Sequence, residues 1–248
     1  MTEPLPGKRA DSFLVEHRYA ASRAEAQAAI KAGHVTADGK PVTKPAQILR
    51  DTMQIAFEKE HPYVSRGALK LVAALDHFGF SPKDRICLDL GASTGGFTQV
   101  LLERGARLVT AIDVGHDQLH RTIGADPRVR SFEGVNARDL TSEVVIEAPE
   151  AIVIDVSFIS LMLALPRALA IAAPGAWLVA LVKPQFEVGR EHIGKGGIVR
   201  DAGAAHAAAE RVAQWLSSIN GWTVAGLIVS PIAGGDGNRE YLLAATKS

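Results

Sequence analysis

Four short, strongly apolar runs recur between residues 85 and 183: RICLDL, RLVTAID, AIVIDVS and AWLVALVK. Segments long enough to form helices separate them. Strands this apolar have to be buried on both faces, and helices that connect successive parallel strands supply that cover. The pattern therefore predicts an α/β unit built on a mostly parallel sheet with helices on both of its faces.

The C-terminal tail departs from this alternation. WTVAGLIVS (222–230) and EYLLAATK (240–247) are joined by PIAGGDGNR, with no helix-length segment between them. Two strands joined without a crossover helix run antiparallel. We therefore expect an antiparallel hairpin at or near one edge of the sheet.

Residues 8–57 predict a second, smaller unit. Ser22 and Glu25 form a capping box at the start of a helix, and Gly33 is suited to end that helix. An upstream segment, 9–19, has its apolar side chains on one helical face. Asp38-Gly39 indicates a tight hairpin turn, and the alternation in MQIAF is typical of a strand. Two helices and a few short strands make a small α+β module.

Residues 58–64, EKEHPYV, are charged, contain a proline and lack periodicity, which predicts a linker. The larger unit then spans residues 65–248. Ser65 is placed to cap a helix over RGALKLVAALDHF, and Gly79 is placed to end it.

Composition narrows the class of protein. The chain has 248 residues, 47% of them hydrophobic, and a formal net charge of zero, so any nucleic-acid binding must come from a local patch. The single cysteine, Cys87, excludes an internal disulfide and argues against a thiolate metal site, and no motif requires a metal. The N-terminus lacks a signal-peptide pattern, and no apolar run approaches the roughly 18 residues of a membrane helix. We expect a soluble, cytoplasmic protein.

The loop Gly91–Gly96 follows the first apolar run and carries two motifs. Gly91 to Gly95 fits G-x-S-x-G, in which Ser93 would be a hydrolase nucleophile. A hydrolase also needs a later histidine, and His192 is the plausible candidate. However, this loop follows the first strand of the sheet, whereas a nucleophile elbow follows a later, central one. The hydrolase interpretation is therefore disfavoured.

A cofactor loop is the other interpretation. A dinucleotide site needs G-x-G-x-x-G, and Ser93 replaces its second glycine. S-adenosyl-L-methionine fits better, because Asp89 precedes Gly91 and Gly95-Gly96 open a helix whose backbone N–H groups suit a carboxylate. Asp113 ends the next strand, where its carboxylate can accept from both ribose hydroxyls.

The N-terminal unit is locally basic. Residues 8–50 hold eight lysines and arginines against four acidic residues, which by itself is also compatible with a solvated helix pair. The segment RADSFLVEHRYAASRAEAQAAIKAGHVTADGKPVTKP resembles the RNA-binding module of the small-subunit ribosomal protein S-four family. That resemblance implies that Arg9, Arg23, Lys31 and Lys44 contact RNA phosphates, largely independently of sequence.

The larger unit carries, in order, LDLGASTGGFTQVLLERGA, AIDVG, IDVSFISL, LVKPQFE and NREYLLAA. These motifs resemble the FtsJ-type 2′-O-ribose methyltransferases. With the S-four-type module and HPYVSRGALKL at the junction, residues 8–247 resemble the TlyA family. The resemblance implies a Rossmann-like class I methyltransferase sheet, S-adenosyl-L-methionine as cofactor, and 2′-O-methylation of cytidine in ribosomal RNA (23S, and 16S in some members). Ribosomal RNA or ribosomal subunits would be the partner.

The same resemblance implies which residues do the chemistry. The Lys-Asp-Lys-Glu tetrad of FtsJ-type enzymes maps onto Lys70, Asp155, Lys183 and Glu240. A partly desolvated lysine that faces another ammonium loses its proton more readily, so Lys183 is the expected base. Taken singly, each could instead be a solvated charge, a cap or a strand end. The expected cofactor residues are Asp89, Gly91, Ser93, Thr94, Gly95, Gly96, Phe97, Asp113, Asn136 and Arg138.

Two further segments leave alternatives open. Ser157 and Phe158 are expected to shape the acceptor pocket, or Phe158 belongs to the core. The Gly194–Gly197 segment is either a loop that closes on RNA or an ordinary glycine loop before a helix. Two other functions also stay open at this point: a non-catalytic ribosome assembly factor that retains the fold, and the haemolysin of an older family label.

Overall fold

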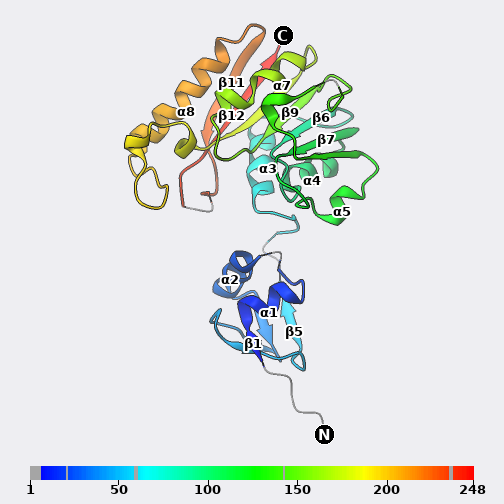
Figure 1. Ribbon diagram of the computed structural model, residues 1–248, viewed down its shortest axis with the longest axis vertical. Coiled ribbons are helices and arrows are strands. Elements are labelled where there is room, and N and C mark those ends of the chain that lie inside the picture. The colour runs from blue at the N-terminus through cyan, green and yellow to red at the C-terminus, as the bar shows by residue number, and fades with distance from the viewer. Residues whose placement is uncertain (1–6, 21, 59–60, 142, 235–236) are drawn as a thin grey trace. The chain divides into compact units, whose positions relative to one another are not determined.

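The computed structural model describes residues 7–20, 22–58, 61–141, 143–234 and 237–248. The chain divides into two compact units, Met1–Pro62 and Tyr63–Ser248, which are described separately (Figure 1). Residues 59–60 of the predicted linker lie outside the described residues.

The N-terminal unit packs two helices over short strands. Phe13, Leu14 and Ile30 from the helices are buried with Val35 and Leu49 from the strands. One small sheet pairs β1 with β4, and a second has the order β3-β2-β5. The elements are β1 (Lys8–Arg9), α1 (Ala10–Glu16), α2 (Arg23–Ala32), β2 (Val35–Ala37), β3 (Lys40–Pro41), β4 (Ile48–Leu49) and β5 (Ile55–Phe57).

The local signals in this unit act as expected, with one correction. The Ser22 hydroxyl accepts a hydrogen bond from the Glu25 amide, and Gly33 ends α2 at φ 81°. Asp38 and Gly39 both have positive φ in the turn between β2 and β3. The predicted helix over 9–19 is shorter, because the chain turns at Arg18, whose φ is 61°, and α1 ends at Glu16.

The C-terminal unit is built on a seven-stranded sheet with the order β11-β12-β10-β9-β6-β7-β8. Strands β10, β9, β6, β7 and β8 are parallel, and β12 runs antiparallel to both β10 and β11. The predicted antiparallel tail is therefore confirmed. The strands are β6 (Ile86–Leu90), β7 (Leu108–Asp113), β8 (Val129–Glu133), β9 (Ala151–Ile154), β10 (Trp177–Val182), β11 (Trp222–Val229) and β12 (Tyr241–Lys247).

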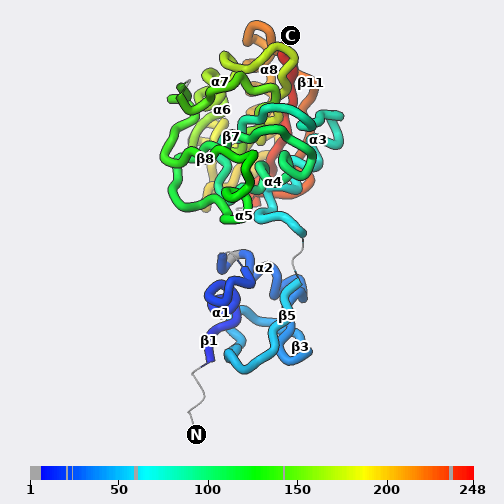
Figure 2. The backbone as a smooth tube through the Cα atoms, turned by 90° about the vertical axis from the view of Figure 1, so that its right-hand side faces the viewer, coloured from blue at the N-terminus to red at the C-terminus, as the bar shows by residue number. Residues whose placement is uncertain are grey.

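Helices cover both faces of this sheet, as the apolar runs predict. Leu88 and Ile152 face a core that α6, α7 and α8 cover, whereas Cys87 and Val153 face the core of α3 and α4. Figure 2 shows α3 and α6 on opposite sides of the sheet. The helices are α3 (Gly67–Phe78), α4 (Gly96–Glu103), α5 (Arg121–Gly124), α6 (Leu161–Ala164), α7 (Pro166–Ile171) and α8 (Ala202–Ser217), with 3-10 turns η1 (Ala137–Asp139), η2 (Pro184–Phe186) and η3 (Arg190–His192).

The start of α3 corrects another expectation. Ser65 does not cap the helix through its side chain; Arg66 is the N-cap residue, and the Ser65 carbonyl accepts from the Ala68 amide. The Ser65 hydroxyl instead packs on Gly96, where an added Cβ would lie 2.2 Å from it. Within the described ranges, no helix is long and apolar enough to cross a membrane.

Candidate active site

The glycine loop leaves the carboxyl end of β6 and approaches the end of β9 closely. At Gly91, with φ 79°, an added Cβ would lie 2.3 Å from the Asp155 carbonyl oxygen. Only glycine combines that backbone conformation with that approach. The loop is thereby held against the residue that follows β9. The carboxyl ends of parallel strands at a change of strand order are where such folds bind ligands.

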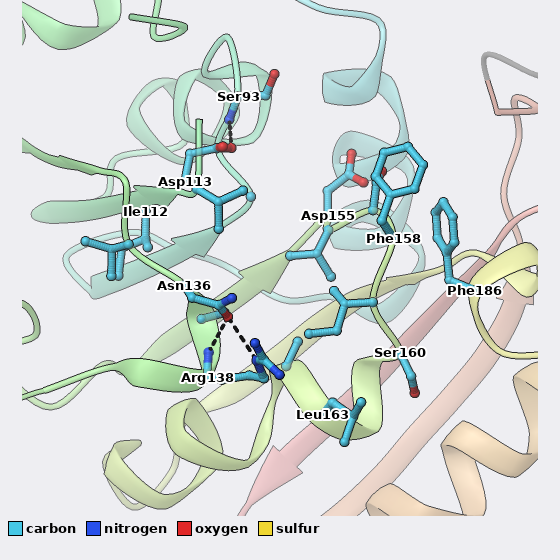
Figure 3. Close-up of a pocket in the computed structure, with 18 of the residues that line it drawn as sticks. Ser93, Ile112, Asp113, Asn136, Arg138, Asp155, Phe158, Ser160, Leu163 and Phe186 are labelled. Atoms are coloured by element: carbon cyan, nitrogen blue, oxygen red, sulfur yellow. Dashed lines mark hydrogen bonds between the residues drawn. The ribbon is translucent and has the colours of Figure 1, made fainter. Parts of the chain in front are cut away.

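Asp113 fixes the other side of the loop. Its carboxylate accepts hydrogen bonds from the Ser93 amide (2.8 Å) and the Gly115 amide (2.7 Å), as Figure 3 shows for Ser93. Gly91, Ser93 and Asp113 line a cavity of about 840 Å³, together with Asn136 and Arg138. All five were expected at the cofactor, and the structure brings them together.

Asn136 and Arg138 line the same cavity. Asn136 caps η1, and its side-chain oxygen accepts from the Arg138 amide at 3.0 Å. Gln118 also lines the cavity, and the Ser93 hydroxyl donates to its Oε1 at 3.1 Å. Gln118 could not be predicted from a motif, because it lies in a loop without one, and only its closeness to Asp113 in the chain could have suggested it.

A second cavity, of about 480 Å³, lies on the α3 side of the loop. Lys70 lines it, as do the predicted residues Thr94, Gly96 and Phe97. Gly91, Ser93 and Asp155 line both cavities. Asp155 is therefore shared by the two cavities, and groups held in either cavity can approach this residue.

The four predicted catalytic residues form two lysine–carboxylate pairs. Lys70 from α3 forms an ion pair with Glu240 at the start of β12, and their side chains are only 9% and 3% exposed. Lys183 Nζ lies 2.6 Å from Asp155 Oδ1 and donates to the Ser157 hydroxyl at 2.8 Å. The Lys183–Asp155 contact joins opposite charges without the angular geometry of a hydrogen bond. Lys70 is thus buried and paired, which is unlike an ordinary solvated helix lysine.

Two expected cofactor residues, Asp89 and Gly95, line neither cavity in the described part of the chain. Asp89 is fully buried and accepts from the Thr98 hydroxyl at 2.6 Å, which ties β6 to α4. Burial raises the pKa of Asp89 to about 7, and the charges of Asp155 and Asp113 act in the same direction. At Gly95 an added Cβ would lie 2.8 Å from Leu119. Both residues therefore hold the glycine loop in shape without lining either cavity.

Phe158 is exposed at the mouth of the first cavity. It is 91% exposed and adopts a φ of 65°, so the alternative that it belongs to the core is wrong. Its ring lies 5.2 Å from that of Phe186, centroid to centroid (Figure 3). A non-glycine residue held in the left-handed region directly beside a candidate catalytic carboxylate is typical of a functional site.

In the N-terminal unit, Asp11 organises two of the four predicted RNA contacts. Its buried carboxylate accepts from Arg9 Nε (3.1 Å), Arg23 Nη2 (2.8 Å) and Gln27 Nε2 (2.9 Å). The hydrogen bonds from Arg9 and Arg23 hold the pKa of Asp11 well below its usual range. Both guanidinium groups remain partly exposed, and Lys31 and Lys44 are exposed.

The strand order, the glycine loop and the two lysine–carboxylate pairs together indicate an FtsJ-like methyltransferase, which this chain joins to an S4 domain. Residues 63–247 match the FtsJ-like methyltransferase family, and residues 8–55 match the S4 domain. The 16S/23S rRNA (cytidine-2′-O)-methyltransferase TlyA of Mycobacterium tuberculosis is 45% identical over 95% of this chain and 88% of its own. This chain belongs to the TlyA family.

Two further similarities bear on that assignment. The 23S rRNA (cytidine-2′-O)-methyltransferase TlyA of Campylobacter jejuni is 39% identical over 72% of this chain and 69% of its own. A solved structure from Streptococcus thermophilus, provisionally titled a hemolysin, is 41% identical with a TM-score of 0.77, over 98% of this chain and 90% of that one. Membership of a methyltransferase family excludes the hydrolase interpretation of Ser93.

Proposed function

We propose that this protein transfers a methyl group from S-adenosyl-L-methionine to the 2′-hydroxyl of a cytidine in 23S ribosomal RNA. One observation carries the proposal: Asp155, paired with Lys183, lines both cavities. The names of both TlyA relatives include 23S RNA, and one also includes 16S RNA, which is the second substrate to test.

The residues around the first cavity fit the cofactor. Asp113 is fixed by two backbone amides and suits a pair of ribose hydroxyls, while Asn136 and Arg138 flank the base. Gly91 has no room for a side chain, and the start of α4 faces the second cavity through Gly96 and Phe97. Bound among these residues, S-adenosyl-L-methionine supplies an electrophilic methyl group.

In this proposal Lys183 first releases the proton of its resting ammonium to solvent, and the neutral amine then accepts the proton of the 2′-hydroxyl. Attack requires an aligned hydroxyl, and alignment can account for roughly 7–11 kcal/mol of the barrier. Asp155 stabilises the ammonium that forms when Lys183 takes the proton, since the two groups lie 2.6 Å apart. The Ser157 hydroxyl, which accepts from Lys183, limits how Lys183 can turn.

The Lys70–Glu240 pair holds a second charge beside the acceptor site. Lys70 lines the cavity that adjoins Asp155, and Glu240 keeps its ammonium from moving into it. Ser157 and Phe158 line the first cavity, and in this proposal they shape the side on which the acceptor nucleotide approaches Asp155. The S4 domain docks the structured RNA through Arg9, Arg23, Lys31 and Lys44, which act by phosphate contacts and release of counterions.

These roles suggest a division of labour along the chain. Residues 8–57 bind RNA, 58–64 form the linker, and 65–248 carry out the methyl transfer in the cytoplasm, where ribosomal subunits assemble. This division is compatible with a chain that has no net charge, because residues 8–50 hold eight lysines and arginines against four acidic residues.

The decisive experiment compares 2′-O-methyl sites on ribosomal RNA from cells with and without this gene, together with the purified protein acting on isolated 50S and 30S subunits. We expect one cytidine of 23S RNA to lose its methyl group in the deletion strain and to regain it in vitro. An unchanged map would contradict the proposal. Calorimetry with S-adenosyl-L-methionine tests the alternative of a non-catalytic assembly factor, which would bind none, and a liposome-leakage assay on the pure protein tests the haemolysin alternative.

A further inference from the structure

The methyltransferase unit contains a small hairpin whose role the methyl-transfer chemistry leaves unexplained. Ile193 and Val199 pair in an antiparallel bridge, and the Gly194 amide donates to the Ile198 carbonyl at 2.9 Å. Gly196 and Gly197 form the turn with φ of 79° and 77°. The segment is thus an ordered hairpin, here called the 193–199 hairpin, that leads towards α8 (yellow in Figure 1).

Residues 189–200 carry an excess of positive charge, whereas the carboxylates on either side are held by other groups: Glu187 accepts from Ser160 and Leu161, and Asp201 accepts from amides at the start of α8. Lys195 is at the tip of the hairpin and Arg200 at its base, and Arg190 and His192 precede it; all are exposed. Glu191 is the only carboxylate between residues 189 and 200, and it lies 3.8 Å from His192. The whole chain has no net charge, so attraction to a polyanion has to come from local clusters of basic residues. This cluster is such a site.

A buried amide ties the hairpin to another part of the chain. Asn238 is 1% exposed; its side-chain oxygen accepts from the Val199 amide (2.9 Å) and its side-chain nitrogen donates to the Gly197 carbonyl (3.0 Å). Its own carbonyl accepts from the Gly234 amide (2.9 Å). Asparagine is suited to this position because it offers a donor and an acceptor at once.

The segment that holds Asn238 also builds the candidate catalytic site. Glu240, two residues on, pairs with Lys70, and Ile232 lines the cavity that contains Lys70. Gly234 packs against the Glu240 carboxylate so closely that an added Cβ would lie 2.5 Å from Oε1. A displacement of the hairpin at Gly197 or Val199 therefore acts on the segment that places Glu240.

We propose that the 193–199 hairpin is a contact surface for the RNA backbone and that Asn238 is a positioning residue that couples this surface to Glu240. The proposal rests on the proposed function, because it assumes an RNA substrate. Phosphates gripped by Lys195 hold the hairpin in one place, and the two side-chain hydrogen bonds of Asn238 pass that constraint to the Lys70–Glu240 pair. Gly196 and Gly197 form the turn of the hairpin, and the basic side chains bind the RNA phosphates.

The test uses the full chain, isolated 50S subunits and four variants: Lys195→Glu, Asn238→Asp, Asn238→Ser and, as a matched control, Lys83→Glu. Lys83 is an exposed lysine that precedes β6, at the opposite end of the strands. For each we measure kcat and KM for the subunit, the salt dependence of binding, the affinity for S-adenosyl-L-methionine and thermal unfolding.

Lys195→Glu is expected to raise KM about 3- to 10-fold at unchanged kcat and to lower the salt slope by about one. Asn238→Asp turns a carboxylate towards the Gly197 carbonyl and is expected to lower kcat about 10- to 100-fold, because a catalytic group is misplaced, while cofactor affinity stays unchanged. Asn238→Ser keeps a donor and an acceptor at shorter reach and retains the fold with a smaller loss of kcat. Lys83→Glu changes none of these.

Three outcomes overturn the inference while leaving the proposed function intact: Lys195→Glu with wild-type KM, both Asn238 variants with wild-type kcat, or Asn238 variants whose only change is a lower unfolding temperature. Failure of the wild-type chain to methylate either subunit is a different result. It would overturn the proposed function, and this inference with it.

Discussion

Two carboxylates, one in each unit, lie beside lysine or arginine side chains, but one is buried among donors and the other borders open cavities. Asp11 in the S4 domain is fully buried and accepts hydrogen bonds from Arg9, Arg23 and Gln27, as well as from the Ser12 amide. Asp155 in the methyltransferase unit is 23% exposed, pairs with Lys183 and lines two cavities. The same chemical group is thus surrounded by donors at one site and open to added molecules at the other.

The difference separates structure from chemistry. A buried charge is tolerated when hydrogen bonds replace its water, and a carboxylate surrounded in this way has little capacity left for a ligand. A carboxylate held by one lysine beside open space can still respond to a charge that forms there. By this criterion Asp11 organises a surface, whereas Asp155 takes part in a reaction.

The largest expected effect comes from the Asp155–Lys183 pair. Lys183→Ala removes the proposed base and Asp155→Ala removes the carboxylate that stabilises it. Each should lower kcat for RNA methylation by at least about 10²- to 10⁴-fold. Affinity for S-adenosyl-L-methionine should stay within a few-fold, because Asp113 and the glycine loop are untouched. Single-turnover methylation with calorimetry measures both quantities.

Lys83→Ala is the matched control, an exposed lysine of the same unit away from the cavities. Full activity in both Asp155→Ala and Lys183→Ala would end the assignment of these residues. It would also remove the contrast with Asp11, since both carboxylates would then be structural.

Asp89 sharpens the comparison, because it is a third carboxylate, fully buried, and no lysine or arginine of the described ranges forms an ion pair with it. Its Oδ1 accepts no hydrogen bond from any described residue, and burial raises its pKa to about 7. The folded state therefore holds a proton that the unfolded chain releases near pH 4, so stability falls as the pH rises from about 4 to 7 and is level above that. The difference is roughly 4 kcal/mol at most.

Asp89→Asn should abolish this dependence. Urea unfolding followed by tryptophan fluorescence at pH 5 and pH 8 measures it, since Trp177, Trp215 and Trp222 all lie in the methyltransferase unit. The wild type should lose stability between the two values, and the variant should lose less. Equal losses would mean that Asp89 is ionised in the folded protein across this range.

The sequence predicted the scaffold of the site better than its contacts. Apolar runs locate β6, β7, β9 and β10, because strands buried on both faces leave a strong signal. Strand β8 escaped that pattern because it lies at the edge of the sheet and is only partly buried. The spacing of the glycine motif placed Asp89 and Gly95 among the expected cofactor residues. In the structure Asp89 is hydrogen-bonded to Thr98 and Gly95 packs on Leu119, so a motif residue can be needed for the conformation of the loop and not for contact with a ligand.

The pairing of the four catalytic candidates could not be predicted. Resemblance supplied Lys70, Asp155, Lys183 and Glu240, but which lysine faces which carboxylate depends on the packing of segments 170 residues apart for Lys70 and Glu240. The Ser65 side chain likewise looked like a cap because serine suits that position. Tertiary contact with Gly96 took precedence over the local preference.

The opposite kind of effect is expected at Asp11. Asp11→Ala leaves Arg9, Arg23 and Gln27 without their shared acceptor, which should cost the S4 domain about 1.5–3 kcal/mol. KM for the ribosomal subunit should rise, because the two guanidinium groups lose their fixed positions, while kcat at saturation and cofactor affinity stay unchanged. Hydrogen exchange resolved by segment locates the loss of stability. A fall in kcat at saturating subunit would show that Asp11 acts in the reaction.

The pH dependence of that stability has the sign opposite to that of Asp89. Since hydrogen bonds from the arginines lower the pKa of Asp11, its contribution is complete above the unfolded pKa near 4 and is lost as the pH falls below that value. Exchange rates in α1 and α2 should therefore be level between pH 7 and 5, after correction for intrinsic rates, and should rise below about pH 4. Asp11→Asn should flatten this change.

The smallest effect is expected at Ser93, which belongs to both cavities yet contributes mainly its backbone. Its φ of 46° is unfavourable for a side chain, and its amide already donates to Asp113. Ser93→Gly relieves that strain and removes only the hydroxyl contact with Gln118, so cofactor affinity should change by no more than about threefold and kcat should persist. A loss of kcat above about 100-fold with cofactor affinity intact would show that the Ser93 hydroxyl itself takes part in the reaction. The catalytic site would then include Ser93 as well as the two lysine–carboxylate pairs.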